Sequence, residues 1–195
     1  MSAIPLSREE IVDRLAKVFR DGGYEAASLT LLARATGLGK ASLYYHFPQG
    51  KEQMAMAVLE QSQERFDTAI LQPLASDAKP VTRITRMIHN IDEYYCQGNE
   101  SCLLGVLAMS ATPAAFHQHI RKGLLRWVDA LAQVLEAYGL PPRSAKLRAE
   151  GAVCMVEGAL LLSRGTGDSQ PFRRILGQLK AYLLAPAQSG SGLPA

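Results

Sequence analysis

Long apolar runs, pairable cysteines and an excess of one charge are all missing from this sequence. Its three cysteines cannot all pair and none forms a CxxC, so we expect reduced thiols and a cytoplasmic location. The longest charge-poor apolar stretch, 151–163, is interrupted by Glu157 and is too short to span a bilayer, so no membrane partner is expected. No basic segment followed by an apolar one opens the chain, and secretion is therefore not expected.

The net charge of +3 carries little information, but the distribution of charge carries more. Residues 26–51 include Arg34, Lys40 and Lys51 and contain no carboxylate. A surface without acidic groups can approach phosphates without repulsion between like charges. Chance would explain the same run, and charge alone leaves both explanations open.

The hydrophobic content of 48% is typical of a globular chain, and the length allows one ordinary domain or two small ones.

Apolar residues recur at helical spacing through almost the whole chain, and no alternating strand pattern is found. A capping box from Ser7 to Glu10 opens the first helix. A second helix, capped by Ser28, should end before Gly37, and a third should run over about 40–46. Short helices joined by a glycine-containing turn are typical of a helix-turn-helix unit.

Longer helices are expected over the rest of the chain. We expect one to begin at 50 or 51 and end at Pro73, and another to be capped by Ser144 and reach about residue 164. The predicted fold is all-α with about nine helices. It comprises a helix-turn-helix DNA-binding domain over 1–50, a larger ligand-binding and dimerisation bundle over 51–185, and a flexible tail over 186–195.

The third helix is unusually rich in aromatic residues, with three of the chain's thirteen within 44–47. Leu43 and Phe47, spaced i and i+4, can share a buried face. The other positions then form an outward surface of donors, small residues and rings, which suits phosphate oxygens and base edges. A surface helix with two half-buried tyrosines would show the same spacing. The outward positions are Lys40, Ala41, Ser42, Tyr44, Tyr45 and His46.

The ordered string from Ser28 to Lys51, with LGKASLYYHF at its centre, resembles the helix-turn-helix signature of TetR/AcrR-family transcriptional regulators. The resemblance covers about residues 8–60, and the succession of longer helices also fits the family. It implies an all-α homodimer that binds a palindromic operator in double-stranded DNA. It further implies a ligand-responsive repressor that is released when a small-molecule effector enters the C-terminal bundle.

Carried over position by position, the resemblance implies eight DNA-binding residues. Tyr44, Tyr45 and Lys51 are expected at phosphates, and Lys40 and Ser42 at base edges. Gly39 stands where the family usually has a serine cap, and the 48–51 linker is one residue longer than the common form. This linker resembles the LmrA- and YxaF-like branch, and its extra residue leaves the placement of Lys51 open. The eight residues are Thr30, Lys40, Ala41, Ser42, Tyr44, Tyr45, His46 and Lys51.

Thioether and aromatic side chains in the bundle are candidates for lining an effector cavity, and they would suit an apolar or aromatic ligand. Taken singly, each is better explained as a core residue. The helix at about 144–164 is rich in small residues, and the resemblance makes it and the helix at 171–184 the homodimer face. A core helix of a monomer would look similar. The cavity candidates are Met87, Tyr94, Met109, Phe116, Trp127 and Met155.

Cys102 heads a short apolar helix, and a thiol at such a place can react with oxidants or electrophiles. The alternative function is therefore a thiol-based redox- or electrophile-sensing repressor, although the setting of Cys102 favours a small buried hydrophobe. No nucleophile elbow or phosphate-binding loop is present, and His117 and His119 would point about 200° apart on a helix. We therefore expect no enzyme, cofactor or metal; a ligand-binding helical enzyme is a third alternative.

Overall fold

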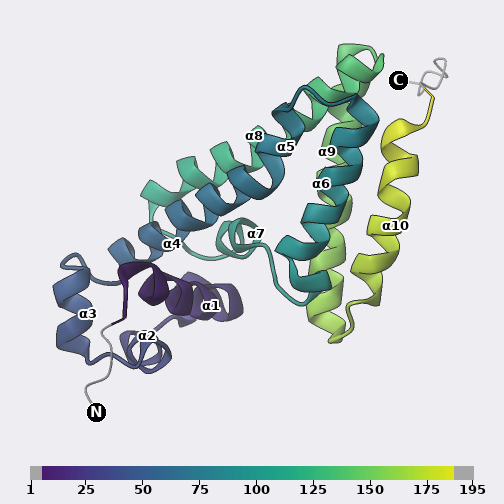
Figure 1. Cartoon of the computed structure of the whole chain (residues 1–195). Helices are drawn as coiled ribbons and strands as arrows, with labels where there is room; N and C mark the ends of the chain where they lie inside the picture. The colour runs from purple at the N-terminus through teal and green to yellow at the C-terminus, as the bar shows by residue number, and fades with distance from the viewer. Residues whose placement is uncertain (1–5, 187–195) are drawn as a thin grey trace, which may run out of the picture. The chain divides into compact units, whose positions relative to one another are not determined.

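The computed structural model describes residues 6–186, and within that range the chain consists of helices and connecting loops without a strand (Figure 1). The predicted all-α fold is confirmed. Of the ten α-helices in the described range, nine have six residues or more and the remaining one, α5, has four. The predicted tail over 186–195 lies almost entirely outside the described residues.

The chain divides into two compact units. The first consists of residues 1–67 and 100–124, and the second of residues 68–99 and 125–195. By compactness, 51–67 and 100–124 thus group with the N-terminal helices. The functional division at residue 50 that the sequence suggested stays a prediction.

The first unit is built from α1 (Arg8–Ala26), α2 (Leu29–Thr36), α3 (Lys40–His46), α4 (Lys51–Phe66), α7 (Leu103–Ala108) and the beginning of α8 (Ala114–Tyr138). Gly123 lets α8 approach its neighbours closely. A Cβ atom there would lie 2.7 Å from both Gln63 Oε1 and Leu104 Cδ1, so a larger residue would force these two side chains to shift. The core of this unit includes Ile11, Leu15, Phe19, Leu32, Leu43, Phe47, Met54, Val58, Leu103, Leu107 and Phe116.

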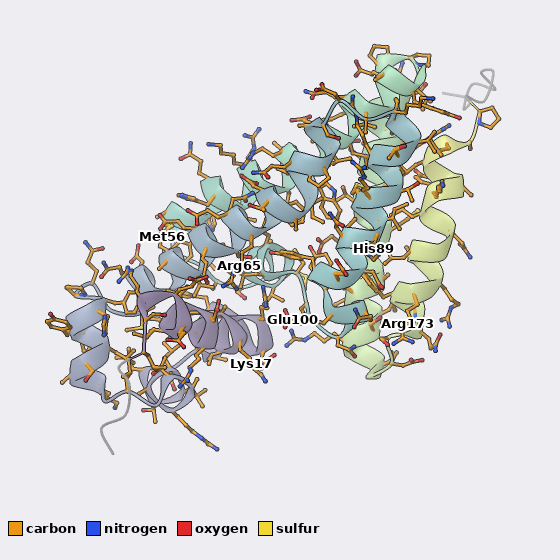
Figure 2. All side chains as sticks on the ribbon, viewed as in Figure 1. Lys17, Met56, Arg65, His89, Glu100 and Arg173 are labelled. Atoms are coloured by element: carbon orange, nitrogen blue, oxygen red, sulfur yellow. The ribbon has the colours of Figure 1, made fainter. Side chains whose placement is uncertain are left out.

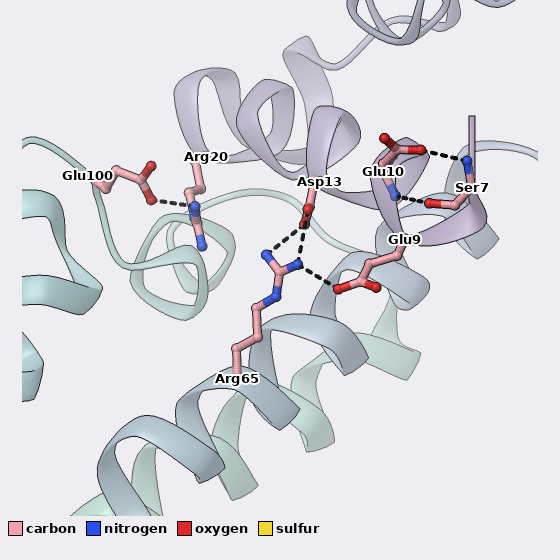
Figure 3. Close-up of polar contacts among 7 residues, drawn as sticks. All are labelled: Ser7, Glu9, Glu10, Asp13, Arg20, Arg65 and Glu100. Atoms are coloured by element: carbon pink, nitrogen blue, oxygen red, sulfur yellow. Dashed lines mark hydrogen bonds and ion pairs between the residues drawn. The ribbon is translucent and has the colours of Figure 1, made fainter. Parts of the chain in front are cut away.

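The capping box at the start of α1 is confirmed (Figure 3). The backbone N–H of Ser7 donates to Glu10 Oε2 at 2.7 Å, and the N–H of Glu10 donates to Ser7 Oγ at 3.2 Å. These hydrogen bonds, the Ser7 backbone first, lower the pKa of Glu10. At its other end α1 kinks at Gly23, whose φ of 71° only glycine adopts readily, and continues to Ala26.

Ion pairs join the helices of the first unit (Figure 3). Arg65 on α4 reaches two carboxylates on α1, with 2.6 Å between its Nη1 and Asp13 Oδ1 and 3.2 Å between its Nη2 and Glu9 Oε1. The hydrogen bond to Asp13 is the main cause that raises the pKa of Arg65. Arg20 on α1 lies 2.5 Å from Glu100, which precedes α7. Because these groups are partly exposed, the pairs fix orientation more than they add stability.

The second unit contains α5 (Gln72–Ala75), α6 (Pro80–Tyr94), a 3₁₀ turn (Cys96–Gly98), the rest of α8, α9 (Pro142–Thr166) and α10 (Gln170–Leu184). Within it, α10 packs along α9 and α6 (Figure 1). The prediction that Ser144 caps α9 is wrong, because the helix begins at Pro142. A proline fits the first turn, where its missing N–H would have no helical partner. The core includes Ile84, Met87, Ile91, Tyr95, Trp127, Leu131, Val156, Phe172, Leu179 and Leu183.

The predicted helix end at Pro73 is also wrong. A π-helical turn (Asp67–Leu71) follows α4 and leads into α5, which includes Pro73. In a continuous α-helix the N–H of residue 73 would serve the carbonyl of Ala69, but proline has none. Asn90 on α6 replaces it, because its Nδ2 donates to the Ala69 oxygen at 2.6 Å. A side chain from a neighbouring helix thus lets the chain pass the proline.

Replacing Asn90 by leucine should therefore lower the free energy of unfolding by about 1–2 kcal/mol, because the Ala69 carbonyl loses its partner. Urea denaturation followed by circular dichroism measures this. His89→Leu, one residue away and exposed on α6 (Figure 2), is the matched control and should change stability by less than about 0.5 kcal/mol. Equal losses in the two variants would contradict the role of Asn90.

Candidate DNA-binding surface

Helices α2 and α3 form the predicted helix-turn-helix. Ser28 Oγ accepts the N–H of Leu31 at 3.3 Å and so caps α2. Gly37 ends α2 in the left-handed conformation, with φ 72° and ψ 9°. Gly39 precedes α3 and provides no side-chain hydrogen bond, as its departure from the family's serine implies. These boundaries confirm the second and third predicted helices.

Two arginines of α1 hold the C-terminal ends of these helices. Arg14 Nη1 donates to the Thr36 carbonyl at 2.9 Å, and Arg8 Nη1 donates to the His46 carbonyl at 3.0 Å. The Arg8 guanidinium also lies 4.7 Å from the centroid of the Phe47 ring. Carbonyls at helix C-termini lack helical partners, and cations are favourable there. Sequence reasoning missed both arginines, because no spacing rule links residues so far apart in the chain.

Helix α3 has the two predicted faces. Leu43 is fully buried and Phe47, directly after the helix, is buried with it. On the other side Tyr45 is 83% exposed and Tyr44 45% exposed, so the alternative of two half-buried tyrosines does not describe Tyr45. His46 is partly buried, whereas Lys40, Ala41, Ser42 and Thr30 are exposed. The exposed side of α3 thus presents an ammonium, hydroxyls and rings in a segment without carboxylates.

Lys51, whose placement the sequence left open, has its ammonium engaged within the protein. Its Nζ donates to the Tyr24 carbonyl at 3.0 Å and lies 4.2 Å from the centroid of the Tyr24 ring. The side chain is partly buried. Its contact with DNA stays a prediction, and the structure adds a contact with the end of α1.

The longer linker between α3 and α4 closes on a glycine. Gly50 is buried with φ 70°, and its N–H donates to the Phe47 carbonyl at 2.8 Å. The ring of Tyr44 packs against Gly50 so closely that a Cβ on this residue would lie only 3.4 Å from Tyr44 Cε1. The linker therefore fixes the direction of Tyr44 as well as the start of α4.

The structure divides the six cavity candidates between the units. Met87 and Trp127 are buried in the second unit, where Tyr94 and Met155 are partly buried. Met109 and Phe116 belong to the first unit: Met109 is 75% exposed, and Phe116 is buried with its ring 5.5 Å from that of Tyr24. Four of the six thus share one unit.

Cys102 is the N-cap of α7, and its Sγ accepts the N–H of Gly105 at 3.5 Å. This contact and its burial give the thiol a structural role, and its role as a sensor stays a prediction. Over residues 6–186 no group of three or more metal-ligating side chains is assembled. None of the helices in that range has the length and apolar character needed to cross a membrane.

The all-helical fold and the exposed third helix of a helix-turn-helix define a class, the helical DNA-binding transcription regulators. Residues 11–58 match the family described as bacterial regulatory proteins, tetR family. Residues 80–178 match the C-terminal domain of LmrA/YxaF-like transcriptional regulators. The chain therefore belongs to the TetR family, with a C-terminal domain of the LmrA/YxaF-like type, and the predicted resemblance is confirmed.

Relatives of known sequence and structure agree with this assignment. The HTH-type transcriptional regulator LmrA of Bacillus subtilis (strain 168) is 27% identical over 173 residues, which cover 87% of this chain and 92% of LmrA. YxaF of the same organism, an uncharacterized HTH-type regulator, is 24% identical over 177 residues, covering 89% and 93%. A TetR transcriptional regulator from Legionella pneumophila has a similar structure, with a TM-score of 0.80, 25% identity and coverage of 92% and 98%.

Proposed function

We propose that the protein is a ligand-responsive repressor that binds a palindromic operator as a homodimer and is released by a small apolar or aromatic effector. The observation that carries this proposal is the exposed side of α3, which lacks carboxylates and displays Tyr45 at 83% exposure above a buried Leu43. Such a helix can enter a major groove while its buried side holds it to the unit. The proposed partner is chromosomal DNA, so we propose a cytoplasmic location and regulation without enzymatic turnover.

The exposed residues of the helix-turn-helix have different proposed tasks. Lys40 and Ser42, near the start of α3, are placed to meet base edges, and the small side chain of Ala41 allows a close approach. Tyr44 and Tyr45 donate to phosphates, with Thr30 and His46 at the margins of the same contact. Half-sites should then lie about 34–36 Å apart or somewhat more.

Binding-site selection from random duplex DNA tests the proposal directly. The purified protein should enrich a palindromic sequence, and a gel shift at fixed salt should show one complex per palindrome. If no duplex is enriched, or if the enriched sequences lack two-fold symmetry, the proposed function is wrong.

The dimer is proposed to form through α9 and α10. Large apolar side chains on α9 are solvent-exposed within one subunit: Leu147 is 60%, Leu161 57% and Leu162 58% exposed. Such exposed apolar side chains on one helix are typical of an interaction surface. Gly158 lies in the same part of α9, and a Cβ there would meet no atom within 4 Å, so this part of the helix is open to a second subunit.

Changing Leu161 to glutamate should therefore weaken the affinity of the two subunits for each other roughly tenfold to hundredfold. The symmetric contact would bury one carboxylate from each subunit, either against the other carboxylate or against apolar groups. Sedimentation velocity over a concentration series measures this. Val81→Glu, at an exposed apolar position on α6, should leave the oligomeric state unchanged. An unchanged dimer in Leu161→Glu would remove α9 from the interface.

The effector is proposed to bind in the second unit, near Met87, Tyr94, Trp127 and Met155. Polarisable thioethers beside aromatic rings suit a flat apolar ligand. A panel of aromatic compounds should contain members that raise the melting temperature and also release the selected operator. Compounds that stabilise the protein without releasing DNA would contradict the proposed response.

A further inference from the structure

Tyr24 lies where three helices of the first unit meet. Its ring stacks on that of Phe19 in the same helix, with 6.3 Å between centroids and 11° between planes. The ring of Phe116, from the start of α8, lies nearly perpendicular to it, with 5.5 Å between centroids and 80° between planes. Lys51, the first residue of α4, places its ammonium 4.2 Å from the ring centroid. One side chain thus contacts α1, α4 and α8.

The Lys51 ammonium also satisfies the end of α1. The last turn of α1 contains no basic residue of its own, and the Tyr24 carbonyl lies in that turn. Carbonyls at a helix C-terminus have no helical partner and favour a cation. Lys51 supplies that cation from another helix, with 3.0 Å between its Nζ and the carbonyl oxygen. The lysine therefore fixes the start of α4 to the end of α1.

The same contact reaches α3 through one residue. Gly50 precedes Lys51 directly, and the Tyr44 ring of α3 packs against Gly50. A shift of Lys51 would move Gly50 and with it the support of Tyr44. On the other side, Phe116 belongs to α8, a single helix whose residues from 125 onward belong to the second unit.

We propose that Lys51 and Tyr24 form a positioning joint that sets the orientation of α3, and that Lys51 acts through Tyr24 instead of binding a DNA phosphate. The proposal rests on the proposed DNA binding by α3 and adds how that helix is held. Phe116 extends the joint to α8, so a displacement of α8 changes the support of Tyr44. Lys51 and Tyr24 are positioning residues, whereas Lys40, Tyr44 and Tyr45 contact the operator.

The salt dependence of operator binding separates the two roles of Lys51. Lys51→Met and Tyr24→Leu should each weaken binding to the selected operator about tenfold, because either change removes the cation–aromatic contact. The double variant should bind no more weakly than the weaker single variant. The slope of log affinity against log salt should stay that of the parent, and Tyr24→Phe, which keeps the ring, should bind like the parent. A phosphate contact would instead lower the slope by about one per subunit in Lys51→Met and leave Tyr24→Leu unaffected, and that result would overturn the proposal.

Hydrogen exchange of the free protein tests the joint without DNA. Lys51→Met and Tyr24→Leu should both speed amide exchange over residues 44–55, which mass spectrometry of peptides resolves. Lys40→Met, which removes an exposed lysine of α3, should leave that exchange unchanged. Parent-like exchange in Lys51→Met would overturn the joint. If the parent selects no DNA while both joint variants exchange faster, the joint is upheld and the proposed function alone fails.

Discussion

Replacing Gly98 by alanine is expected to lower the free energy of unfolding by about 3–5 kcal/mol, since backbone strain and overpacking add at this position. Gly98 has φ +87°, a conformation that side chains with a Cβ rarely adopt. A Cβ there would lie 2.7 Å from the Cβ of Phe172 and 2.8 Å from its Cδ1. Phe172 is fully buried, and its ring meets that of Tyr95 at 6.2 Å, so moving it would disturb this packing. Urea denaturation of the variant and the parent measures the loss.

Gly167→Ala is the control that isolates the backbone part of this effect. Gly167 ends α9 with φ +67°, but a Cβ there would meet no atom within 4 Å. This variant should lose only about 1 kcal/mol, the cost of a left-handed conformation for alanine. If the two variants lost the same amount, the packing of Gly98 on Phe172 would not contribute.

The strain around Gly98 is not confined to the glycine. Cys96 and Gln97 also have positive φ, at 47° and 55°, so three successive residues leave the ordinary helical region. A positive φ at a residue other than glycine costs on the order of 1–3 kcal/mol of folding free energy. Such a conformation persists only where the surrounding structure enforces it. Here the segment packs against α6, α9 and α10. The segment ends at the point where the chain passes from the second unit to the first.

Much of the fold could be predicted from the sequence because local rules set most helix ends. The Ser7 capping box, the Ser28 cap and the left-handed Gly37 each act within four residues, and each is found as predicted. The failure at Pro73, in contrast, has a long-range cause. The chain passes Pro73 because Asn90, on another helix, serves the Ala69 carbonyl. Such a contact between helices leaves no periodic signal in the sequence.

The candidate DNA-binding surface divides in the same way. Helical spacing was sufficient to predict that Leu43 is buried and Tyr45 is exposed, because both residues lie within one turn of the same helix. The supports of the helix-turn-helix could not be predicted, since they are tertiary contacts. Arg8 reaches the end of α3, Arg14 reaches the end of α2, and Lys51 at the start of α4 reaches Tyr24. Composition likewise grouped six thioether and aromatic residues into one site, whereas the three-dimensional structure places four of them in one unit.

Replacing Lys40 by alanine is expected to weaken operator binding by about 2–6 kcal/mol per dimer, since each half-site contact of this kind contributes about 1–3 kcal/mol. Lys40 is the first residue of α3 and is exposed, so its ammonium can reach base edges in the groove that the helix enters. The fold should be unaffected, because the side chain takes part in none of the hydrogen bonds that hold the helix-turn-helix to α1. Gel shifts against the selected operator and against a random duplex, at one salt concentration, measure the loss.

Lys79→Ala is the matched control, because it removes an exposed lysine that precedes α6 in the second unit. Both variants lose one positive charge, and they differ only in where on the protein that charge is lost. Lys40→Ala should lose most of its affinity for the operator relative to random duplex, whereas Lys79→Ala should keep the parent's ratio. If both variants lost affinity equally for both duplexes, Lys40 would act only as a diffuse charge, and sequence reading would have to lie elsewhere on α3.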